Sequence, residues 1–238
     1  MSNVTPQELA TFYDRMYATQ GLKAMRTAEH YEEVFQRLQP VRREAKSLDI
    51  GCGTGFFLKA ALNAGLDAYG IEISQEALDF SRHIAPQAHL VLGSGEQLPF
   101  PDAMFDYIVF GGTLEHFLDP DKGLQEAARV AKPDATFLII VPNSRYWLWR
   151  VRGEYGTNQS KIKELLQDYD TWVAMFRRHG IEPVSVTQDP WPWKSVTIFK
   201  KKNPWNIMRR IVYRMIWWFI PLRLTYQFVF VCKKTATR

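Results

Sequence analysis

The stretch from Leu48 to Phe56 constrains the fold of this chain more than any other. It reads Leu-Asp-Ile-Gly-Cys-Gly-Thr-Gly-Phe, so a short apolar segment carrying Asp49 runs directly into three glycines at alternate positions. Apolar residues then recur at helical spacing until Asn63-Ala64-Gly65 ends the run. A strand, a glycine-rich turn and a helix in this order favour the opening of a nucleotide-binding α/β unit over an ordinary strand-to-helix turn.

The glycine spacing distinguishes between nucleotides. A dinucleotide fingerprint, G-x-G-x-x-G, places a pyrophosphate on the helix N-terminus, but here the third glycine comes one residue early and Phe56 takes its place. Asp49 would repel a pyrophosphate and attract a cation, and S-adenosylmethionine carries an ammonium and a sulfonium but no phosphate. The pattern Asp-x-Gly-x-Gly-x-Gly resembles motif I of the class I S-adenosylmethionine-dependent methyltransferases, in particular those of quinone biosynthesis and those that modify lipids or glycans.

Alternating strands and helices after this motif predict a parallel sheet with helices on both faces. The resemblance implies an α/β, Rossmann-like fold. Its seven-stranded sheet is mostly parallel with the last strand antiparallel between the fifth and sixth, and it carries an N-terminal helical cap and an insertion before the last strand. The expected strands are 47–50, 66–71, 88–92, 105–110, 136–143, 183–187 and 225–234, and the expected helices include 6–19, 27–39, 118–131 and 170–179.

The resemblance also implies where the methyl donor binds. Glu72 ends the second strand, where a carboxylate can accept both ribose hydroxyls, and Ile73 would flank the adenine. The loop 93–100 resembles the segment that closes over adenine, although Ser94 stands where the family usually has an aspartate and Glu96 and Gln97 are alternative acceptors. The implied cofactor-binding residues are Tyr13, Asp49, Gly51, Cys52, Gly53, Gly55, Glu72, Ile73, Gly95, Glu96, Gln97, Gly111 and Leu114.

Two candidate features face the substrate side. His116 follows the fourth strand at the mouth of the site and could act as general base for a substrate hydroxyl, because an imidazole titrates near neutral pH. The structural alternative is that Glu115-His116 is a general family feature whatever the substrate. Tyr13 and Tyr17 lie on an aromatic face of the first helix, and either cover the cofactor and substrate pocket or pack in the core.

Basic residues are concentrated at the C-terminal end. Eleven of the 30 basic residues lie from Lys194 onward, where no acidic residue occurs, so the preceding chain holds 19 bases against 25 acids. A helix over 206–220 would be amphipathic with a basic polar face, which suits an anionic membrane interface. Packing on the sheet or in a dimer is the alternative, and nucleic acid is disfavoured because no recognition module occurs. The longest uncharged run is too short to span a bilayer.

These observations predict a single methyltransferase domain over 1–238, divided into a cap (1–45), a cofactor-binding core (46–143), a lid (144–180) and a basic aromatic insertion (190–224). We expect an S-adenosylmethionine-dependent methyltransferase that acts on a small hydrophobic or lipid-linked acceptor, with O-methylation favoured. The alternative is a binding or regulatory protein of the same fold. The two cysteines and the lack of metal-ligand spacing predict no metal and a cytoplasmic location, at the inner face of the membrane if 194–224 binds anionic lipid. The acceptor and the oligomeric state are left open.

Overall fold

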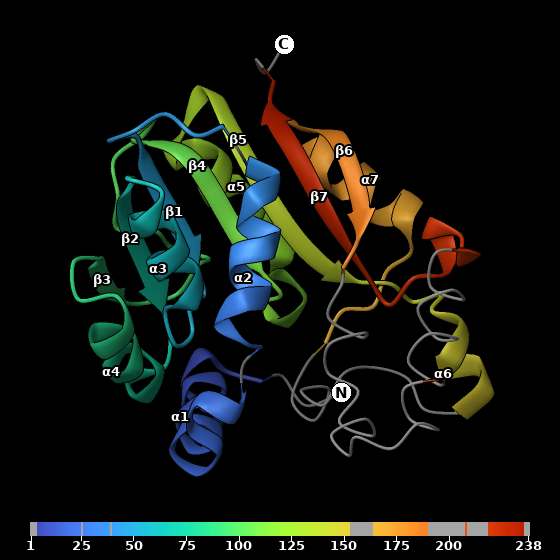
Figure 1. Ribbon diagram of the computed structural model, residues 1–238, viewed down its shortest axis with the longest axis horizontal. Helices are drawn as coiled ribbons and strands as arrows, with labels where there is room; N and C mark the ends of the chain where they lie inside the picture. Colours follow the sequence, from blue (N-terminus) through green and yellow to red (C-terminus); the bar gives the residue numbers. More distant parts are fainter. Residues whose placement is uncertain are drawn as a thin grey trace.

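The computed structural model describes residues 4–24, 26–38, 40–152, 164–189, 208 and 219–235. Strands and helices alternate through most of this part of the chain (Figure 1). The strands are β1 Lys46–Ile50, β2 Asp67–Glu72, β3 His89–Leu92, β4 Phe105–Gly111, β5 Ala131–Pro142, β6 Ile181–Gln188 and β7 Gln227–Lys234. The α-helices are α1 Pro6–Gln20, α2 Ala28–Phe35, α3 Phe56–Asn63, α4 Gln75–Ile84, α5 Pro120–Val130, α6 Trp147–Arg152 and α7 Tyr169–Arg178.

The seven strands form one sheet in the order β3-β2-β1-β4-β5-β7-β6. β1 to β5 are parallel to their neighbours, whereas β7 runs antiparallel to both β5 and β6. The predicted fold class is therefore confirmed, including the position of the last strand. The strand order reverses between β1 and β4, and ligands of open α/β sheets bind beyond the carboxyl ends of the strands at such a point.

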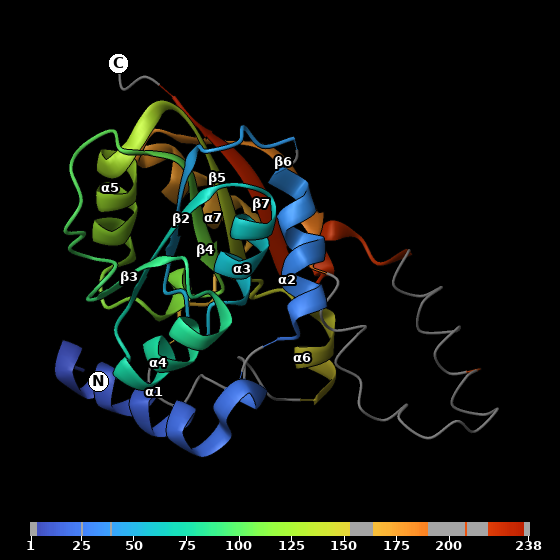
Figure 2. The ribbon, with the colours of Figure 1, turned by 60° about the vertical axis from the view of Figure 1, so that its left-hand side comes forward.

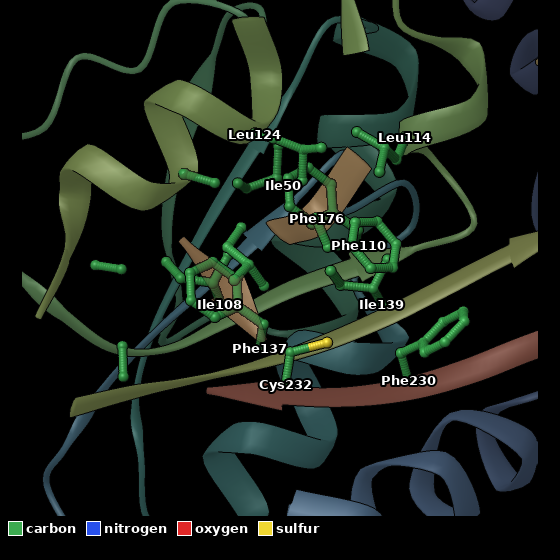
Figure 3. Close-up of a cluster of buried hydrophobic side chains, with 14 of the residues drawn as sticks. Ile50, Ile108, Phe110, Leu114, Leu124, Phe137, Ile139, Phe176, Phe230 and Cys232 are labelled. Atoms are coloured by element: carbon green, nitrogen blue, oxygen red, sulfur yellow. The ribbon is translucent and has the colours of Figure 1, made fainter. Parts of the chain in front are cut away.

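Helices cover both faces of the sheet, because each face presents a buried apolar surface. α5 and α7 pack on one face, where Leu124 and Phe176 meet Ile108, Phe137 and other strand residues (Figure 3). α2 and α3 cover the opposite face. α1 lies across the carboxyl end of the sheet beside α4 (Figures 1 and 2). This arrangement places the N-terminal helix over the ends of β1 and β2.

Local sequence signals explain several helix ends. Thr5 and Glu8 form the predicted capping box of α1, with Pro6 in its first turn. Ser74 caps α4 by accepting a hydrogen bond from the Ala77 amide. The predicted helix 27–39 is α2 followed by a 3₁₀ turn, Gln36–Leu38, and Gln39 lies outside the described residues.

One pair of predicted boundaries is wrong. The helix predicted to reach Ala131 ends at Val130, and the fifth strand begins at Ala131 rather than at residue 136. The Lys132 ammonium lies 2.9 Å from the Asp106 carboxylate, which holds this segment against β4. The strand register shifts between Phe105 and Tyr107, and this irregularity accommodates the early start. The other six strands are present, with ends displaced by at most two residues.

Two predicted regions are only partly described. The lid 144–180 is described except for residues 153–163, and contains α6 and α7. Of the helix predicted over 206–220, the structure describes only Met208, Phe219 and Ile220. Most of the insertion 190–224 also lies outside the described residues. Among the helices of the described segments, none is both long enough and apolar enough to cross a membrane.

Candidate active site

The glycine loop after β1 is shaped by backbone contacts that require glycine. The Gly51 and Cys52 amides both donate to the Ile71 carbonyl, which ties the loop to the end of β2. Gly51, Gly53 and Gly55 all have positive φ angles, of 75°, 53° and 83°. A Cβ on Gly51 would lie 2.5 Å from Thr113 Cγ2. The loop is therefore fixed from two neighbouring strands before α3 begins.

Cys52 presents its backbone rather than its thiol to this loop. The Cys52 side chain is buried, with Sγ 4.0 Å from the Ser81 hydroxyl. A Cβ on Gly70 would lie 2.8 Å from the same sulfur. Burial raises the pKa of this thiol well above its usual range. The Cys52 thiol therefore packs between α4 and β2.

Glu72 fastens the glycine loop to the turn that follows β2. Its carboxylate accepts hydrogen bonds from the backbone amides of Gly53 (2.9 Å), Ile73 (2.9 Å) and Ser74 (3.0 Å). Burial raises the pKa of Glu72, and the three amide donors oppose that rise. A carboxylate has about four acceptor positions, so the three amides fix its orientation and leave room for a further donor. Its predicted role toward ribose stays a prediction.

Asp49 contributes a buried carboxyl group without a polar partner in the described segments. It is 4% exposed, and no hydrogen bond or ion pair engages its carboxylate within the described segments. Burial, with the nearby Glu72 adding to it, raises the pKa of Asp49 to about 8. A buried carboxyl group beside a second one favours a cationic ligand, as the sequence predicted for this position.

The loop after β3 holds the residues predicted around adenine. The Glu96 carboxylate accepts from the Leu118 amide at 2.7 Å, so it links this loop to the segment before α5. A Cβ on Gly95 would lie 2.5 Å from both Ile50 and Phe117, so Gly95 allows the loop to lie against the end of β1. Gln97 is exposed. The choice between these residues as adenine partners is untested.

The segment after β4 lies at the same edge of the sheet. The Thr113 hydroxyl donates to the Ile50 carbonyl at 2.8 Å, and Gly111 ends the strand. Leu114, predicted near the cofactor, is fully buried in the core cluster of Figure 3. Glu115 and His116 are 1% and 5% exposed in the 3₁₀ turn Leu114–His116 (η3). His116 as general base remains a prediction.

α1 covers the carboxyl end of the sheet through contacts that the sequence did not predict. The Asp14 carboxylate accepts from the Ser74 hydroxyl (2.7 Å) and the Glu76 amide (3.3 Å), at the start of α4. Tyr17 is 4% exposed, and burial, then Glu72, raises the pKa of its phenol. Tyr13 lies edge-to-face with His116, with ring centroids 6.3 Å apart. No sequence pattern pairs Asp14 with Ser74, because the two residues lie 60 positions apart in the chain.

A buried charged cluster between the start of α2 and strands β6 and β7 was also missed. Arg26, which precedes α2, lies 3.0 Å from the carboxylate of Asp189 and hydrogen-bonds Gln227. The imidazole of His30 lies 3.5 Å from the same carboxylate, and both His30 and Asp189 are fully buried. Arg26 and His30 lie four residues apart at the start of α2, whereas Asp189 and Gln227 come from two distant segments, so no sequence pattern joins all four. They tie the N-terminal cap to the ends of β6 and β7.

An aromatic cluster stands beside this charged one. Tyr146, Trp149 and Tyr226 contact one another edge-to-face, with ring centroids 5.2 to 6.0 Å apart. Tyr146 and Trp149 come from the predicted lid, whereas Tyr226 precedes β7. The lid residues described here therefore pack at the start of the last strand, at the carboxyl end of β5.

A separate depression lies at the opposite edge of the sheet. It has a volume of about 350 Å³ and is lined by Arg42, Arg43, Glu44, Ala45, Lys46, Pro101, Asp102, Met104, Asp106 and Lys132. Asp106 holds ion pairs with Arg42 and Lys132, so its charge is matched within the protein. None of the predicted site residues lines this depression, and its contacts fasten the amino ends of β1 and β5 to β4.

Comparison with known proteins identifies similar chains. Residues 48–139 match the family model described as a methyltransferase domain. A demethylmenaquinone methyltransferase of Geobacillus kaustophilus is 30% identical over 76% of this chain and 88% of its own. An uncharacterised protein of Methanocaldococcus jannaschii is 32% identical over 67% of this chain, which spans 59% of that relative.

Solved structures agree on the fold. The 1,6-didemethyltoxoflavin-N1-methyltransferase of Burkholderia thailandensis, solved with bound 1,6-didemethyltoxoflavin and S-adenosylhomocysteine, superposes with a TM-score of 0.63. The superposition covers 98% of this chain and 92% of that one, at 17% sequence identity. A likeness at this identity bears on the fold alone.

Proposed function

The chain belongs to the class I S-adenosylmethionine-dependent methyltransferases, and we propose that it methylates a small hydrophobic or lipid-linked acceptor at the carboxyl edge of its sheet. The observation that carries this proposal is Asp49, a buried carboxyl group with no hydrogen-bonding partner in the described part of the chain. The methyl donor supplies the electrophilic methyl group and two cationic centres. Asp49, Glu72 and the glycine loop fit such a ligand, because two buried carboxyl groups favour positive charge.

The chain's own residues would mainly bind and orient. In a methyl transfer the nucleophile attacks the methyl carbon in line with the leaving sulfur, so positioning supplies much of the rate. Glu72 would hold the ribose side, and Gly95, Glu96 and Gln97 would lie around adenine. α1, fastened by Asp14, would exclude water from the same region.

Aromatic side chains support a hydrophobic acceptor. Tyr146, Trp149 and Tyr226 form a cluster beyond the end of β5, and aromatic surfaces of this kind suit flat or apolar ligands. The relative from Geobacillus is named for demethylmenaquinone, which agrees with this choice. We propose a hydroxyl as the methylated group, because Glu115 and His116 lie buried at the mouth of the site and either could take its proton.

We also propose that residues 194–224 bring the enzyme to an anionic membrane surface. This segment carries eight of the eleven C-terminal bases and no acid, and each base near such a surface contributes roughly 1 kcal/mol. The test is flotation of the full chain with vesicles of neutral and of anionic lipid. Recovery with anionic vesicles alone supports the proposal, whereas equal recovery with both, or none with either, contradicts it.

The methyl transfer is tested with S-adenosylmethionine carrying a labelled methyl group and a total extract of metabolites and lipids. We expect the full chain to label one class of extracted compound. Glu72→Ala should abolish labelling, and Glu76→Ala, on the exposed side of α4, should retain it. A folded chain that binds S-adenosylmethionine and labels nothing in any extract would favour a binding or regulatory protein of the same fold.

A further inference from the structure

Glu115 is a buried carboxyl group beside the predicted cofactor site. It lies in η3 at the carboxyl end of β4, and the Leu165 amide donates to its backbone carbonyl at 2.7 Å. The side chain is 1% exposed, and within the described segments its Oε2 atom has no hydrogen-bond partner. A buried carboxyl oxygen without a donor is unfavourable, so it is expected where a ligand supplies the donor.

Several elements bring charged or titratable groups to Glu115. They are His116 in the same turn, Tyr13 from α1, Arg26 before α2, Glu164 before α7 and Tyr226 before β7. Burial raises the pKa of Glu115 to about 7; His116 and Arg26 oppose this rise, whereas Glu164 adds to it. A carboxyl group that titrates near neutral pH can take a proton in one step and release it in the next.

The neighbours of Glu115 place it between the two halves of the site. The pKa of the Tyr13 phenol is raised by burial and then by Glu115, Glu72 and Glu164, so Tyr13 lies within the field of all three carboxyl groups. Tyr226, a member of the aromatic cluster, is influenced by both Arg26 and Glu115. η3 follows β4, which lies between β1 and β5 in the sheet, so Glu115 lies between the proposed cofactor side, which contains Glu72, and the proposed acceptor side, which contains Tyr226.

We propose that Glu115, rather than the adjacent His116, is the general base that removes the proton of the methyl acceptor. This assignment rests on the proposed methyl transfer to a hydroxyl. An oxygen lone pair of the acceptor forms the new bond to the methyl carbon, and the carbon–sulfur bond breaks with its electron pair remaining on sulfur. The hydroxyl proton passes to Glu115 Oε2 and leaves to solvent after the product departs. The imidazole of His116, by contrast, packs against the Tyr13 ring.

The proposal is tested with Glu115→Gln, which keeps the size of the side chain and removes its basicity. Label transfer from methyl-labelled S-adenosylmethionine to the metabolite and lipid extract is followed from about pH 5.5 to about pH 9. We expect Glu115→Gln to lower the rate of label transfer by on the order of 10²-fold or more. The rate that remains should no longer decrease as the pH is lowered, because the titrating base has been removed. The transfer rate of His116→Asn should still decrease at low pH. Glu182→Gln, which alters an exposed glutamate on β6, should behave as the unaltered chain.

The assignment would be overturned if Glu115→Gln transferred the label at nearly the original rate. It would also be overturned if the transfer rate of His116→Asn no longer decreased at low pH. Calorimetry with S-adenosylmethionine separates this failure from that of the proposed function, because a folded chain without affinity for the donor argues against the function itself. Infrared titration of the carboxyl groups needs no acceptor. A protonated carboxyl signal at about pH 6 that disappears in Glu115→Gln supports the proposal, and a Glu115 already ionised at about pH 5 contradicts it.

Discussion

Asp49 illustrates how one residue couples the stability of the fold to binding. Its carboxyl group is buried beside Glu72 at the end of β1, and its pKa is raised to about 8 from an ordinary value of 3.8. Between these two pH values the folded chain holds a proton that the unfolded chain has lost, so stability falls as pH rises through this window. A cationic ligand reverses the preference, because it favours the ionised carboxylate.

We therefore expect the affinity for S-adenosylmethionine to rise with pH. Between about pH 6 and about pH 7.5 the amino group of the ligand stays protonated while Asp49 must lose its proton, so the affinity should increase by up to about tenfold per pH unit. Asp49→Asn should bind weakly with a flat profile, and Asp79→Asn, an exposed carboxylate on α4, should follow the unaltered chain. Calorimetric titration at several pH values measures this, and an equally steep profile in Asp49→Asn would refute the role.

Thermal unfolding of the ligand-free chain gives the matching measurement. Because Asp49 makes the fold less stable as pH rises from about 4 to about 8, Asp49→Asn should unfold at a higher temperature than the unaltered chain near the upper end of this window. The difference should shrink toward the acid end. A lower unfolding temperature for Asp49→Asn at all pH values would contradict this prediction, because it would show that the Asp49 carboxyl group stabilises the ligand-free fold.

At the scale of single residues the sequence identified those tied to a local motif. Asp49 and the glycines follow from a strand–turn–helix pattern, and Glu72 was placed by its distance along the next unit. The sequence analysis missed Asp14, Arg26 and Asp189, because each contacts a residue that is distant in the chain. Asp14 hydrogen-bonds Ser74, and Arg26 pairs with Asp189. Distance in the sequence hides such pairs.

At the scale of elements, α1 is the part whose placement matters most for the site. It lies beside α4 at the carboxyl end of the sheet (Figure 2). The Asp14 carboxylate accepts a hydrogen bond from the Glu76 amide and so caps α4 from outside that helix. The amino-terminal end of α4 is thereby built from Ser74 on the helix itself and Asp14 on its neighbour. The cap over the site and the turn after Glu72 thus depend on the same contact.

Asp14→Ala should loosen α1 from α4. Loss of a capping carboxylate typically lowers stability by about 1 kcal/mol, and here it should also weaken binding of S-adenosylmethionine and speed proteolytic cleavage within residues 4–24. Limited proteolysis with and without the ligand measures both effects. Asp79→Ala alters an exposed carboxylate on α4 and serves as the control; equal cleavage rates in the two variants would show that Asp14 does not hold the cap.

Element boundaries were predictable where capping or apolar runs are local. Thr5 and Ser74 begin helices as expected, and the apolar run from Phe105 forms β4. The start of β5 was not predictable, because the pairing of Lys132 with Asp106 extends the strand past Pro133. The place of β7 between β5 and β6 came from the family resemblance rather than from any pattern in its residues.

At the scale of the whole molecule, the proposed cofactor and acceptor functions lie in different halves of one edge of the sheet. The ends of β1, β2 and β3 carry Asp49, Glu72 and the loop predicted around adenine. The ends of β4 to β7 carry Glu115, the aromatic cluster and the charged contact between Arg26 and Asp189. In the proposed methyl transfer the donor and the acceptor meet between these two halves.

Calorimetric titration of the full chain with S-adenosylmethionine, with NAD as the comparison, tests this assignment most directly. We expect saturable binding of S-adenosylmethionine, no binding of NAD, and loss of binding in both Glu72→Ala and the milder Glu72→Gln while circular dichroism shows that the fold persists. A folded chain that binds NAD, or that binds no S-adenosylmethionine, would contradict a cation-binding site at the carboxyl ends of β1 and β2.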